Sequence, residues 1–373
     1  MKYIHETAEW PEMIYDENAL YDPLMQFYLA KGRLFGKLDV LGFDVQNDLI
    51  LNAVSDEVVT SSEIEGEKLD KSSVRSSVAK RLGLETAGIV DIIANHYTEG
   101  IVDMVLDATQ KFSQQVTNER LFDWHAALFP TGWSGLRKIT VGAYRLDEIS
   151  IISGAISKEK VHYVAPSPER VPDEMEKYLK WFESEQKIDP YVKAGLAHLW
   201  FESIHPFDDG NGRIGRALAD LLLARADNST KRFYSLSSQF LKERAEYYKE
   251  LETAQRCTGN AGSWIIWFIG CLTRAIKASE EKLEKAMQKA AIFEQLSNTS
   301  MNKRQILVVN KLIDGFEGKL TTAKWAKLCK CSHDTALRDI DDLIKKNVLQ
   351  RSPEGGRSTS YELSTSIRGI INQ

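Results

Sequence analysis

The chain lacks most features that mark secreted and membrane proteins. Cysteine is scarce, with 4 among 373 residues, at positions 257, 271, 329 and 331, and no CxxC pair. This density excludes a disulfide scaffold and is typical of a reducing compartment. The longest apolar run, residues 264–272, is much shorter than the about 20 residues that span a bilayer. The N-terminus has no basic region followed by an apolar segment, so we expect no secretory signal and no membrane contact.

Excess charge, internal repeats and low-complexity tracts are also missing. The net charge of −5 does not suggest a protein that coats nucleic acid or a membrane surface. With 43% hydrophobic and 27% charged residues, the chain can bury a large core and is long enough for two or three domains. Together these observations predict a cytoplasmic, multidomain globular protein.

One short segment, HPFDDGNGRIGR at residues 205–216, has the composition of a phosphate site. The small residues 210–212 let backbone N–H groups approach an anion, and the helix that follows presents its positive dipole end to the same anion. Arg213 and Arg216 are three residues apart, so they share a helix face from which they can contact successive phosphates.

Three further residues of this segment have distinct chemistry. Asp209 offers a hard oxygen ligand for Mg²⁺. His205 is the only residue of the segment with an unperturbed pKa near neutral pH, which makes it the candidate general base. Phe207 is interpreted as an apolar anchor that holds the loop to the core. The segment therefore predicts a site for a nucleoside triphosphate with Mg²⁺.

The same segment resembles the motif of the Fic family, HxFx(D/E)GNGRxxR. The matching positions are His205, Phe207, Asp209, Gly210, Asn211, Gly212, Arg213 and Arg216. At average residue usage such a match arises by chance on the order of 10⁻¹⁰ times per start position, which makes coincidence a poor explanation. The resemblance implies a Fic-type helical core. For most relatives it also implies transfer of AMP from ATP to a Ser, Thr or Tyr hydroxyl of a protein, with release of pyrophosphate.

The resemblance also implies a role for each residue of the ATP site. His205 would deprotonate the target hydroxyl, and Asp209 would hold Mg²⁺ between the α- and β-phosphates. Asn211 and the loop amides would bind the α-phosphate. Arg213 would contact the β-phosphate and Arg216 the γ-phosphate, so that positioning and charge stabilisation carry the rate.

A second pattern lies upstream, in TSSEIEGEKLD at residues 60–70. Ser61 and Glu65 are four apart on one predicted helix face, and Gly66 follows directly. This matches (S/T)xxxE(G/N), the inhibitory pattern of some Fic proteins, in which the glutamate pairs with the second motif arginine, here Arg216. The resemblance therefore implies autoinhibition through Ser61 and Glu65. Some relatives with this glutamate also remove AMP from targets, so the reverse reaction stays open, as does the trigger that relieves the inhibition.

Residues 138–166 predict a β-hairpin. Segments 149–152 and 161–164 are rich in β-branched residues and flank a turn at Gly154. Fic proteins have such a flap beside the active loop, where it pairs with the main chain of the target. The alternative is a surface hairpin without function.

Two other positions near the motif have less specific patterns. Tyr247 and Tyr248 are adjacent on a predicted helix, and Tyr248 is the candidate to contact adenine while the other ring packs in the core. His198 lies two helical turns before His205. We expect it to be a buried packing residue rather than a metal ligand, because the spacing is not that of a zinc motif.

The chain is mainly α-helical by its pattern. We expect an N-terminal extension at residues 1–42, a Fic core at 43–297 with the inhibitory helix near 60–66, and a separate unit at 298–373. Helices of the core are expected at residues 45–60, 70–82, 89–108, 118–129, 172–185, 190–203, 213–227, 238–256 and 262–295.

The last unit resembles a winged helix-turn-helix. Its expected elements are helices at 303–313, 321–329 and 332–346, strands at 349–351 and 361–363, and a turn at 354–360.

The charges of this unit do not favour DNA as a partner. Arg338 and Arg357 could meet phosphates, whereas Asp339, Asp341 and Asp342 would repel them. We favour a protein-contact or homodimer role for the unit over DNA binding.

Two functions follow from these patterns. The first is an autoinhibited protein adenylyltransferase that uses ATP and Mg²⁺ and modifies a protein substrate or itself. The alternative is a DNA-binding transcriptional regulator whose Fic-like core senses nucleotide. The intact His205 favours the first, because sensing requires no base while transfer to a hydroxyl does.

Overall fold

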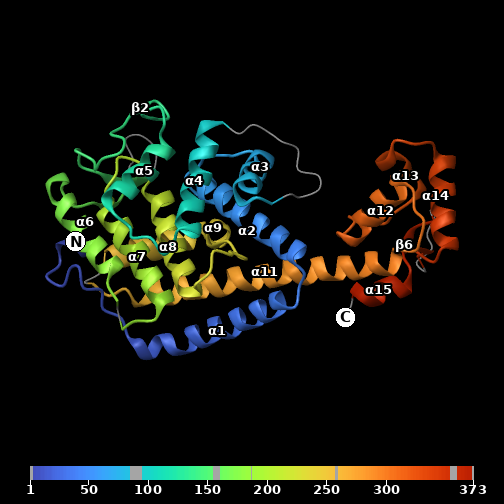
Figure 1. Cartoon of the computed structure of the whole chain (residues 1–373), viewed down its shortest axis with the longest axis horizontal. Coiled ribbons are helices and arrows are strands. Elements are labelled where there is room, and N and C mark those ends of the chain that lie inside the picture. The colour runs from blue at the N-terminus through green and yellow to red at the C-terminus, as the bar shows by residue number, and fades with distance from the viewer. Residues whose placement is uncertain are drawn as a thin grey trace. The chain divides into compact units, whose positions relative to one another are not determined.

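The structure, a computed structural model, consists of two units. They are an N-terminal unit, Met1–Glu280, and a C-terminal unit, Glu281–Gln373, each described by itself (Figure 1). The division lies inside helix α11, Gly262–Leu296, because the last turns of this helix contribute Ile292 and Leu296 to the core of the second unit. The sequence had placed the division at 297/298. The described residues are 3–84, 95–153, 160–185, 187–256, 259–352 and 359–371.

The N-terminal unit is mainly helical, as the sequence predicts. Its α-helices are α1 (Glu17–Asp39), α2 (Phe43–Ile64), α3 (Lys71–Leu82), α4 (His96–Gln110), α5 (Asn118–Leu128), α6 (Val171–Glu183), α7 (Pro190–Ile204), α8 (Asn211–Asp227), α9 (Leu236–Lys242), α10 (Arg244–Gln255) and the first part of α11. Short 3-10 turns, η1 and η2, cover Ile4–Glu6 and Pro168–Arg170. Helix α1 occupies a region to which the sequence assigned no helix. The start of the helix expected at 89–108 lies outside the described residues.

Two antiparallel hairpins interrupt the helices. The first joins β1 (Trp133–Ser134) and β2 (Arg137–Lys138), and the second joins β3 (Ser150–Ser153) and β4 (Lys160–Val164). The second hairpin confirms the strands predicted within residues 138–166, with Ile151 opposite Tyr163 and a bulge at Ile151/Ile152. The turn predicted at Gly154 lies outside the described residues.

Helices α7 and α8 pack at the centre of the unit and carry the motif between them (Figure 1). Asp189 caps α7, since its carboxylate accepts a hydrogen bond from the Tyr191 N–H at 2.9 Å, and Pro190 occupies the first helical position. Gly215 of α8 permits the close approach of the two helices, because a Cβ there would lie 2.7 Å from a Glu202 carboxylate oxygen.

The helix expected at residues 238–256 is wrong in one respect, because the structure breaks it at Glu243. Helix α9 ends at Lys242 and α10 begins at Arg244, while Glu243 has φ −108° and ψ 27°. Arg274 of α11 donates hydrogen bonds to the Glu243 carboxylate at 2.5 and 2.6 Å. The contact between Arg274 and Glu243 is found where the helix breaks. Helix propensity alone does not reveal such a break.

Residues 3–42 belong to the same unit as the core rather than to a separate extension. The Trp10 indole N–H donates to the Glu174 carboxylate at 2.7 Å, and Ile14 forms a β-bridge with Asn260. Helix α1 buries Phe27 and Leu34 on its inner face.

The C-terminal unit contains helices and one hairpin in the predicted order. Its elements are α12 (Lys303–Ile313), α13 (Thr322–Cys329), α14 (His333–Lys345), β5 (Leu349–Arg351), β6 (Tyr361–Leu363) and α15 (Thr365–Ile371), the last of which was not expected. Trp325, Ile340 and Leu363 lie in its hydrophobic core. These bounds agree with the predicted helices and strands, and the winged-helix assignment itself stays a prediction. Most of the turn at 354–360, including Arg357, lies outside the described residues.

The acidic residues of α14 differ from the expectation. Asp339 is buried and accepts two hydrogen bonds from Arg304, at 2.7 and 3.0 Å. Asp342 accepts from Gln305 at 2.8 Å and from Lys346 at 2.6 Å. Because these carboxylates are paired inside the unit, they do not form the open repulsive face that the sequence suggested. Among the described residues, no helix is both long and apolar enough to cross a membrane.

Candidate active site

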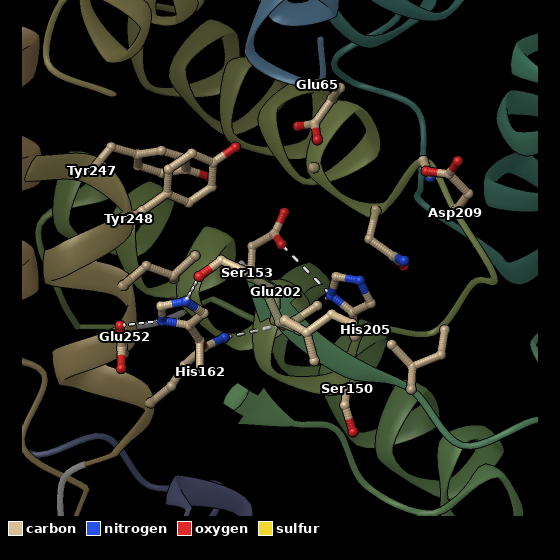
Figure 2. Close-up of a pocket in the computed structure, with 18 of the residues that line it drawn as sticks. Glu65, Ser150, Ser153, His162, Glu202, His205, Asp209, Tyr247, Tyr248 and Glu252 are labelled. Atoms are coloured by element: carbon tan, nitrogen blue, oxygen red, sulfur yellow. Dashed lines mark hydrogen bonds and ion pairs between the residues drawn. The ribbon is translucent and has the colours of Figure 1, made fainter. Parts of the chain in front are cut away.

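His205 lies at the point where α7 ends. It adopts a left-handed conformation, with φ 52° and ψ 59°, and its N–H closes the helix on the Phe201 carbonyl at 2.9 Å. This turn directs the imidazole into the same cavity as Glu202 and Glu65 (Figure 2). Residues other than glycine rarely adopt positive φ, and strained backbone of this kind is common at functional positions.

The proton of the His205 ring can be assigned from its surroundings. Nδ1 lies 3.3 Å from the Glu202 carbonyl oxygen, which can only accept, so Nδ1 carries the proton and Nε2 has a free lone pair. Burial lowers the pKa of His205 to about 4, although the Glu202 carbonyl acts in the opposite direction. The ring is therefore neutral at pH 7 and able to accept a proton.

The loop after His205 is held by its own side chains. The Asn211 amide accepts from the Phe207 N–H at 2.9 Å and donates to the Phe207 carbonyl at 2.8 Å. Phe207 is fully buried, as expected of an anchor. Gly210 has φ 83°, and a Cβ there would lie 2.9 Å from the Phe129 ring. In the structure the Asn211 side chain stabilises the loop, and the expected contact of Asn211 with the α-phosphate stays a prediction.

Two buried residues that the sequence did not single out support this loop. His125 lies on α5, and its Nε2 donates to the Asp209 carbonyl at 3.1 Å while Nδ1 accepts from the Gly142 N–H at 3.2 Å. The ring also stacks on Phe207, with centroids 4.4 Å apart. Burial lowers the pKa of His125 to about 4, so it supports the loop as a neutral ring.

Arg145 is the second supporting residue. Its guanidinium donates to the carbonyls of His205 at 2.8 Å, Asp147 at 2.8 Å and Pro166 at 2.5 Å. Its backbone N–H donates to the Pro206 carbonyl at 2.9 Å. This one buried side chain therefore joins the His205 turn to both ends of the segment that contains the β3–β4 hairpin. Its position, 60 residues before His205, left no local signal in the sequence.

The two motif arginines are buried on α8. Arg213 contacts the carboxylate of Glu67 at 3.2 Å and the Tyr97 hydroxyl, and its guanidinium lies 5.0 Å from the Phe129 ring centroid. Neither Arg213 nor Arg216 is among the described residues that line the cavity. Both face carboxylates of the segment that follows α2, and their expected contacts with phosphates stay predictions.

Arg216 meets the predicted inhibitory residues. Its Nε donates to the Ser61 hydroxyl at 3.0 Å, and one terminal nitrogen donates to the Ser61 carbonyl at 2.7 Å. The other terminal nitrogen lies 2.9 Å from Glu65 Oε1. Burial by itself would lower the pKa of Arg216, but the neighbouring acidic groups, of which Glu65 contributes most, together outweigh it and the pKa is raised. The sequence pattern therefore pointed to side chains that the fold brings together.

The end of α2 explains the geometry of Glu65. The helix stops at Ile64, Glu65 is its C-cap, and Gly66 follows with φ 87°. A glycine is favoured there because other residues are strained at this φ. A Cβ on Gly212 would lie 2.2 Å from Glu65 Oε1, so the glycine of the loop also leaves room for the carboxylate.

Glu202 is a third carboxyl group at the site, and the sequence did not identify it. Its Oε2 lies 3.8 Å from His205 Nδ1, and its buried Oε1 has no hydrogen-bond partner among the described residues. Burial, together with the negative charge of Glu65, raises the pKa of Glu202 to about 8. The group is therefore largely protonated at neutral pH.

Asp209 is the most exposed acid of the loop, with 42% of its side chain accessible. It accepts from the Ser134 hydroxyl and from the Gly210 N–H at 2.5 Å, and it lies 3.6 Å from Arg213. Among the described residues no group of three or more metal-ligating side chains is present. A single accessible carboxylate fits Mg²⁺, which usually keeps waters and binds substrate phosphates as well.

A cavity of about 880 Å³ joins these elements (Figure 2). The predicted site residues that line it are Glu65, His205, Asp209, Gly210, Asn211, Gly212 and Tyr248. Tyr248 is 41% exposed, whereas the neighbouring Tyr247 is buried, and its hydroxyl forms a hydrogen bond with His198 Nε2 at 2.9 Å. His198 also stacks on Trp264, which confirms the expected packing role.

The hairpin forms one wall of the cavity. Ser150, Ile152 and Ser153 of β3 line it. Strand β4 is joined to α10 at the cavity, since His162 Nδ1 lies 2.6 Å from the Glu252 carboxylate and both residues line it (Figure 2). The hairpin expected from the sequence therefore lies beside His205.

Family models match two parts of the chain. Residues 115–223 match the Fic/DOC family, and residues 3–84 match a domain of unknown function, DUF4172. The second match covers α1, α2 and α3, and it includes Ser61 and Glu65.

Curated relatives match the chain in part. A probable protein adenylyltransferase of Aquifex aeolicus is 32% identical over 110 residues, 30% of this chain and 31% of the relative. The protein adenylyltransferase Fic of Nematostella vectensis is 24% identical over 231 residues, 61% of this chain and 49% of the relative. The chain thus spans half or less of the length of these relatives.

Solved structures agree in fold. A Fic family protein from Desulfovibrio desulfuricans G20 aligns with a TM-score of 0.56 at 18% identity, over 95% of this chain and 99% of that one. A Fic domain containing signaling protein from Bacteroides thetaiotaomicron aligns with a TM-score of 0.51 at 18% identity, over 70% of this chain and 98% of that one. The chain therefore contains a Fic/DOC domain, which carries His205 and the start of α8.

Proposed function

We propose that this protein transfers AMP from ATP to a Ser, Thr or Tyr hydroxyl of a protein, and that Glu65 holds it in an inactive state. The observation that carries this proposal is the contact of Glu65 and Ser61 with the buried Arg216, because Glu65 also lines the cavity that contains the neutral His205. The names of the curated relatives support the same reaction.

In the proposed reaction His205 Nε2 accepts the proton of the target hydroxyl. The hydroxyl oxygen then forms a bond to the α-phosphorus, the bond from that phosphorus to the bridging oxygen breaks, and pyrophosphate leaves with the electron pair. Backbone N–H groups of Gly210, Asn211 and Gly212, at the start of α8, would bind the α-phosphate oxygens. Asn211 would contribute its backbone, because its side chain stabilises the loop.

The β- and γ-phosphates would take the two arginines away from their present carboxylate partners. Arg213 would leave Glu67, and Arg216 would leave Glu65. Mg²⁺ held by Asp209 and the phosphates would supply positive charge beside the leaving group. Adenine would stack near Tyr248, the exposed ring of the cavity wall.

The target segment would add to the hairpin. Strand β3 has one partner, β4, and its Ile152 and Ser153 side chains are exposed beside the cavity. An extended peptide that pairs with this edge would bring its hydroxyl toward His205. A partner of this kind needs no membrane and no nucleic acid.

The strength of the proposed inhibition can be estimated from the ion pair between Glu65 and Arg216. An Arg–carboxylate pair with charge-assisted hydrogen bonds contributes about 1.5–3 kcal/mol. Because Glu65 is 30% exposed, solvent screening places the value toward the lower end. We therefore expect Glu65→Gly to raise AMP transfer by roughly tenfold, following the factor of 10 for each about 1.4 kcal/mol.

The test uses ATP labelled at the α-phosphate, with Mg²⁺ and the full chain, and follows label on the protein itself or on targets in a lysate. Glu65→Gly should label more than the parent, and Glu65→Gly/His205→Ala should not label. Glu63→Gly is the matched control, since Glu63 is exposed two residues earlier on α2. If Glu65→Gly is no more active than the parent at saturating ATP, the proposal that Glu65 inhibits AMP transfer is wrong. If the double variant still labels, the role of His205 is wrong.

The same assay addresses the reverse reaction and the C-terminal unit. Loss of label from a modified target on incubation with the parent protein would show AMP removal. A protein-contact role for α14 remains our proposal for the C-terminal unit, and a chain truncated before α12 should keep self-labelling if that unit only recruits targets.

A further inference from the structure

The outer face of α1 carries an exposed apolar stripe. Tyr28, at its edge, donates from its hydroxyl to the Asp189 carboxylate at 2.7 Å, and its ring contacts Tyr191 edge to face. The members of the stripe and their exposed fractions are Tyr21 at 66%, Met25 at 43%, Tyr28 at 43% and Leu29 at 60%. They recur at spacings of three and four, so they share one face of the helix, opposite the buried Phe27 and Leu34. Large contiguous apolar patches of this kind mark interaction surfaces.

Two glycines continue the stripe toward the end of α1. Gly32 and Gly36 lie on the same face, and a Cβ built on either would meet nothing within 4 Å. Glycine is less favourable than alanine inside a helix, and no contact in the described residues requires it here. Two such glycines, four apart, provide a flat surface on which bulky side chains of another helix can rest.

We propose that this face is the interface of a homodimer, in which α1 packs antiparallel on α1 of a second copy. The arrangement of the stripe is self-complementary about the midpoint between Tyr28 and Leu29. Tyr21 lies as far before this midpoint as Gly36 lies after it, and the same holds for Met25 and Gly32. In an antiparallel pair related by a two-fold axis, Tyr21 and Met25 therefore each face a glycine of the partner, while Tyr28 faces Leu29.

Charge supports the same orientation and a second copy as the occupant. Asp22 and Arg33 are both exposed, lie on the same flank of the stripe, and form no ion pair within the described residues. In the antiparallel pair Asp22 of one copy lies beside Arg33 of the other, with an offset of about 3 Å along the axis at a rise of about 1.5 Å per residue. A parallel pair would instead leave Asp22 and Arg33 of the two copies eleven residues apart along the axis, too far for an ion pair.

The proposal gives the homodimer a different surface from the one that the sequence favoured. From the sequence we expected the C-terminal unit to contact another protein or a second copy. The exposed apolar stripe lies instead on α1 of the N-terminal unit (Figure 1). It is independent of the proposed AMP transfer, because none of the stripe residues lines the cavity.

A charge-exchange experiment on the full chain tests the interface and its orientation. The mass of the parent, Asp22→Arg, Arg33→Asp and the double variant would be measured by sedimentation equilibrium over a range of concentrations. Each single variant places like charges in contact twice, so we expect its dimer to be weaker by roughly tenfold or more, as for other contacting charge pairs. The double variant should dimerise like the parent. A mixture of the two single variants should also form a heterodimer, because its charges again match.

The apolar part of the interface has its own variant and control. Leu29→Glu should leave the chain monomeric, while Leu136→Glu, at a position that is 98% exposed outside α1, should leave the dimer unchanged. Gly32→Ala and Gly36→Ala should weaken the dimer and at the same time raise the thermal stability of the monomer, which shows that they fold. A parent that is monomeric at every concentration, or a dimer that Leu29→Glu leaves intact, overturns the proposal. Single charge variants that fail to form the heterodimer overturn the antiparallel orientation.

Discussion

At the scale of single residues, the site depends on side chains that hold the backbone as much as on those that face the cavity. Asn211 and Arg145 fix the two sides of the His205 turn through backbone groups. Groups of this kind contribute to rate by keeping the reacting atoms in position rather than by touching them. The sequence motif identified the first because it lies within the loop, and it missed the second because the contact is formed only on folding.

Arg145→Met should therefore lower both stability and rate. The substitution keeps the length of the side chain but leaves the carbonyls of His205, Asp147 and Pro166 without their donor. We expect the free energy of unfolding to fall by about 2–4 kcal/mol. In the Glu65→Gly background kcat should fall by roughly 10- to 100-fold.

Urea unfolding and single-turnover AMP transfer measure the two effects. Arg145→Lys is the control, since it keeps the charge but cannot contact three carbonyls at once, and it should lie between the parent and Arg145→Met. A rate equal to that of the parent in a folded Arg145→Met protein would contradict the positioning role.

At the scale of elements, the proposed inhibition depends on where α2 ends. Glu65 is the residue at which helical geometry stops, and the positive φ of Gly66 turns the chain away immediately afterwards. Helix α3 also ends at a glycine with positive φ, since Gly83 has φ 64°. Only the first of these two helix ends presents a carboxylate to Arg216.

Gly66→Ala and Gly83→Ala form a matched pair for this reason. Neither added Cβ would meet an atom within 4 Å, so the effect of each comes from the strain of a positive φ. Each should reduce the free energy of unfolding by about 1 kcal/mol. Only Gly66→Ala should raise AMP transfer, because relief of the strain moves Glu65, and the rise should be smaller than for Glu65→Gly. Equal labelling by the two variants would show that the end of α2 does not control the site.

At the scale of the whole molecule, the N-terminal unit buries several neutral titratable groups. Burial lowers the pKa of His198 to about 3 and that of His125 to about 4. Their ordinary pKa is about 6.5, so between pH 6.5 and about 4 the unfolded chain binds more protons than the folded one. Stability that is present above pH 6.5 is therefore lost as the pH falls.

We expect the free energy of unfolding to decrease from pH 6.5 toward pH 4 by up to about 1.4 kcal/mol per pH unit for each such histidine. Urea unfolding at pH 7, 6 and 5 measures the slope. His198→Gln should reduce it, while His96→Gln, at an exposed position, should leave it unchanged. Glu202 has the opposite effect, because its pKa is raised to about 8 in the folded protein. The stability that its protonated form contributes is lost as the pH rises above the ordinary pKa of a glutamate. A slope that does not respond to His198→Gln would contradict the burial argument.

What the sequence determined by itself was local in character. The helix α12, the strands β5 and β6 and the loop at 205–216 could be predicted because capping, periodicity and motif spacing act within a few residues. The inhibitory pattern was also readable as a pattern, since Ser61, Glu65 and Gly66 are nearly adjacent.

Tertiary structure alone decided which of these local features meet. Ser61 and Arg216 are 155 residues apart, and their contact exists because α2 packs against α8. The break at Glu243, the support from Arg145 and the exposed face of α1 likewise depend on what each side chain finds after folding. Local sequence sets the conformation of a segment, but burial and long-range packing determine its partners, which here include the contact of Arg216 with Ser61 and Glu65.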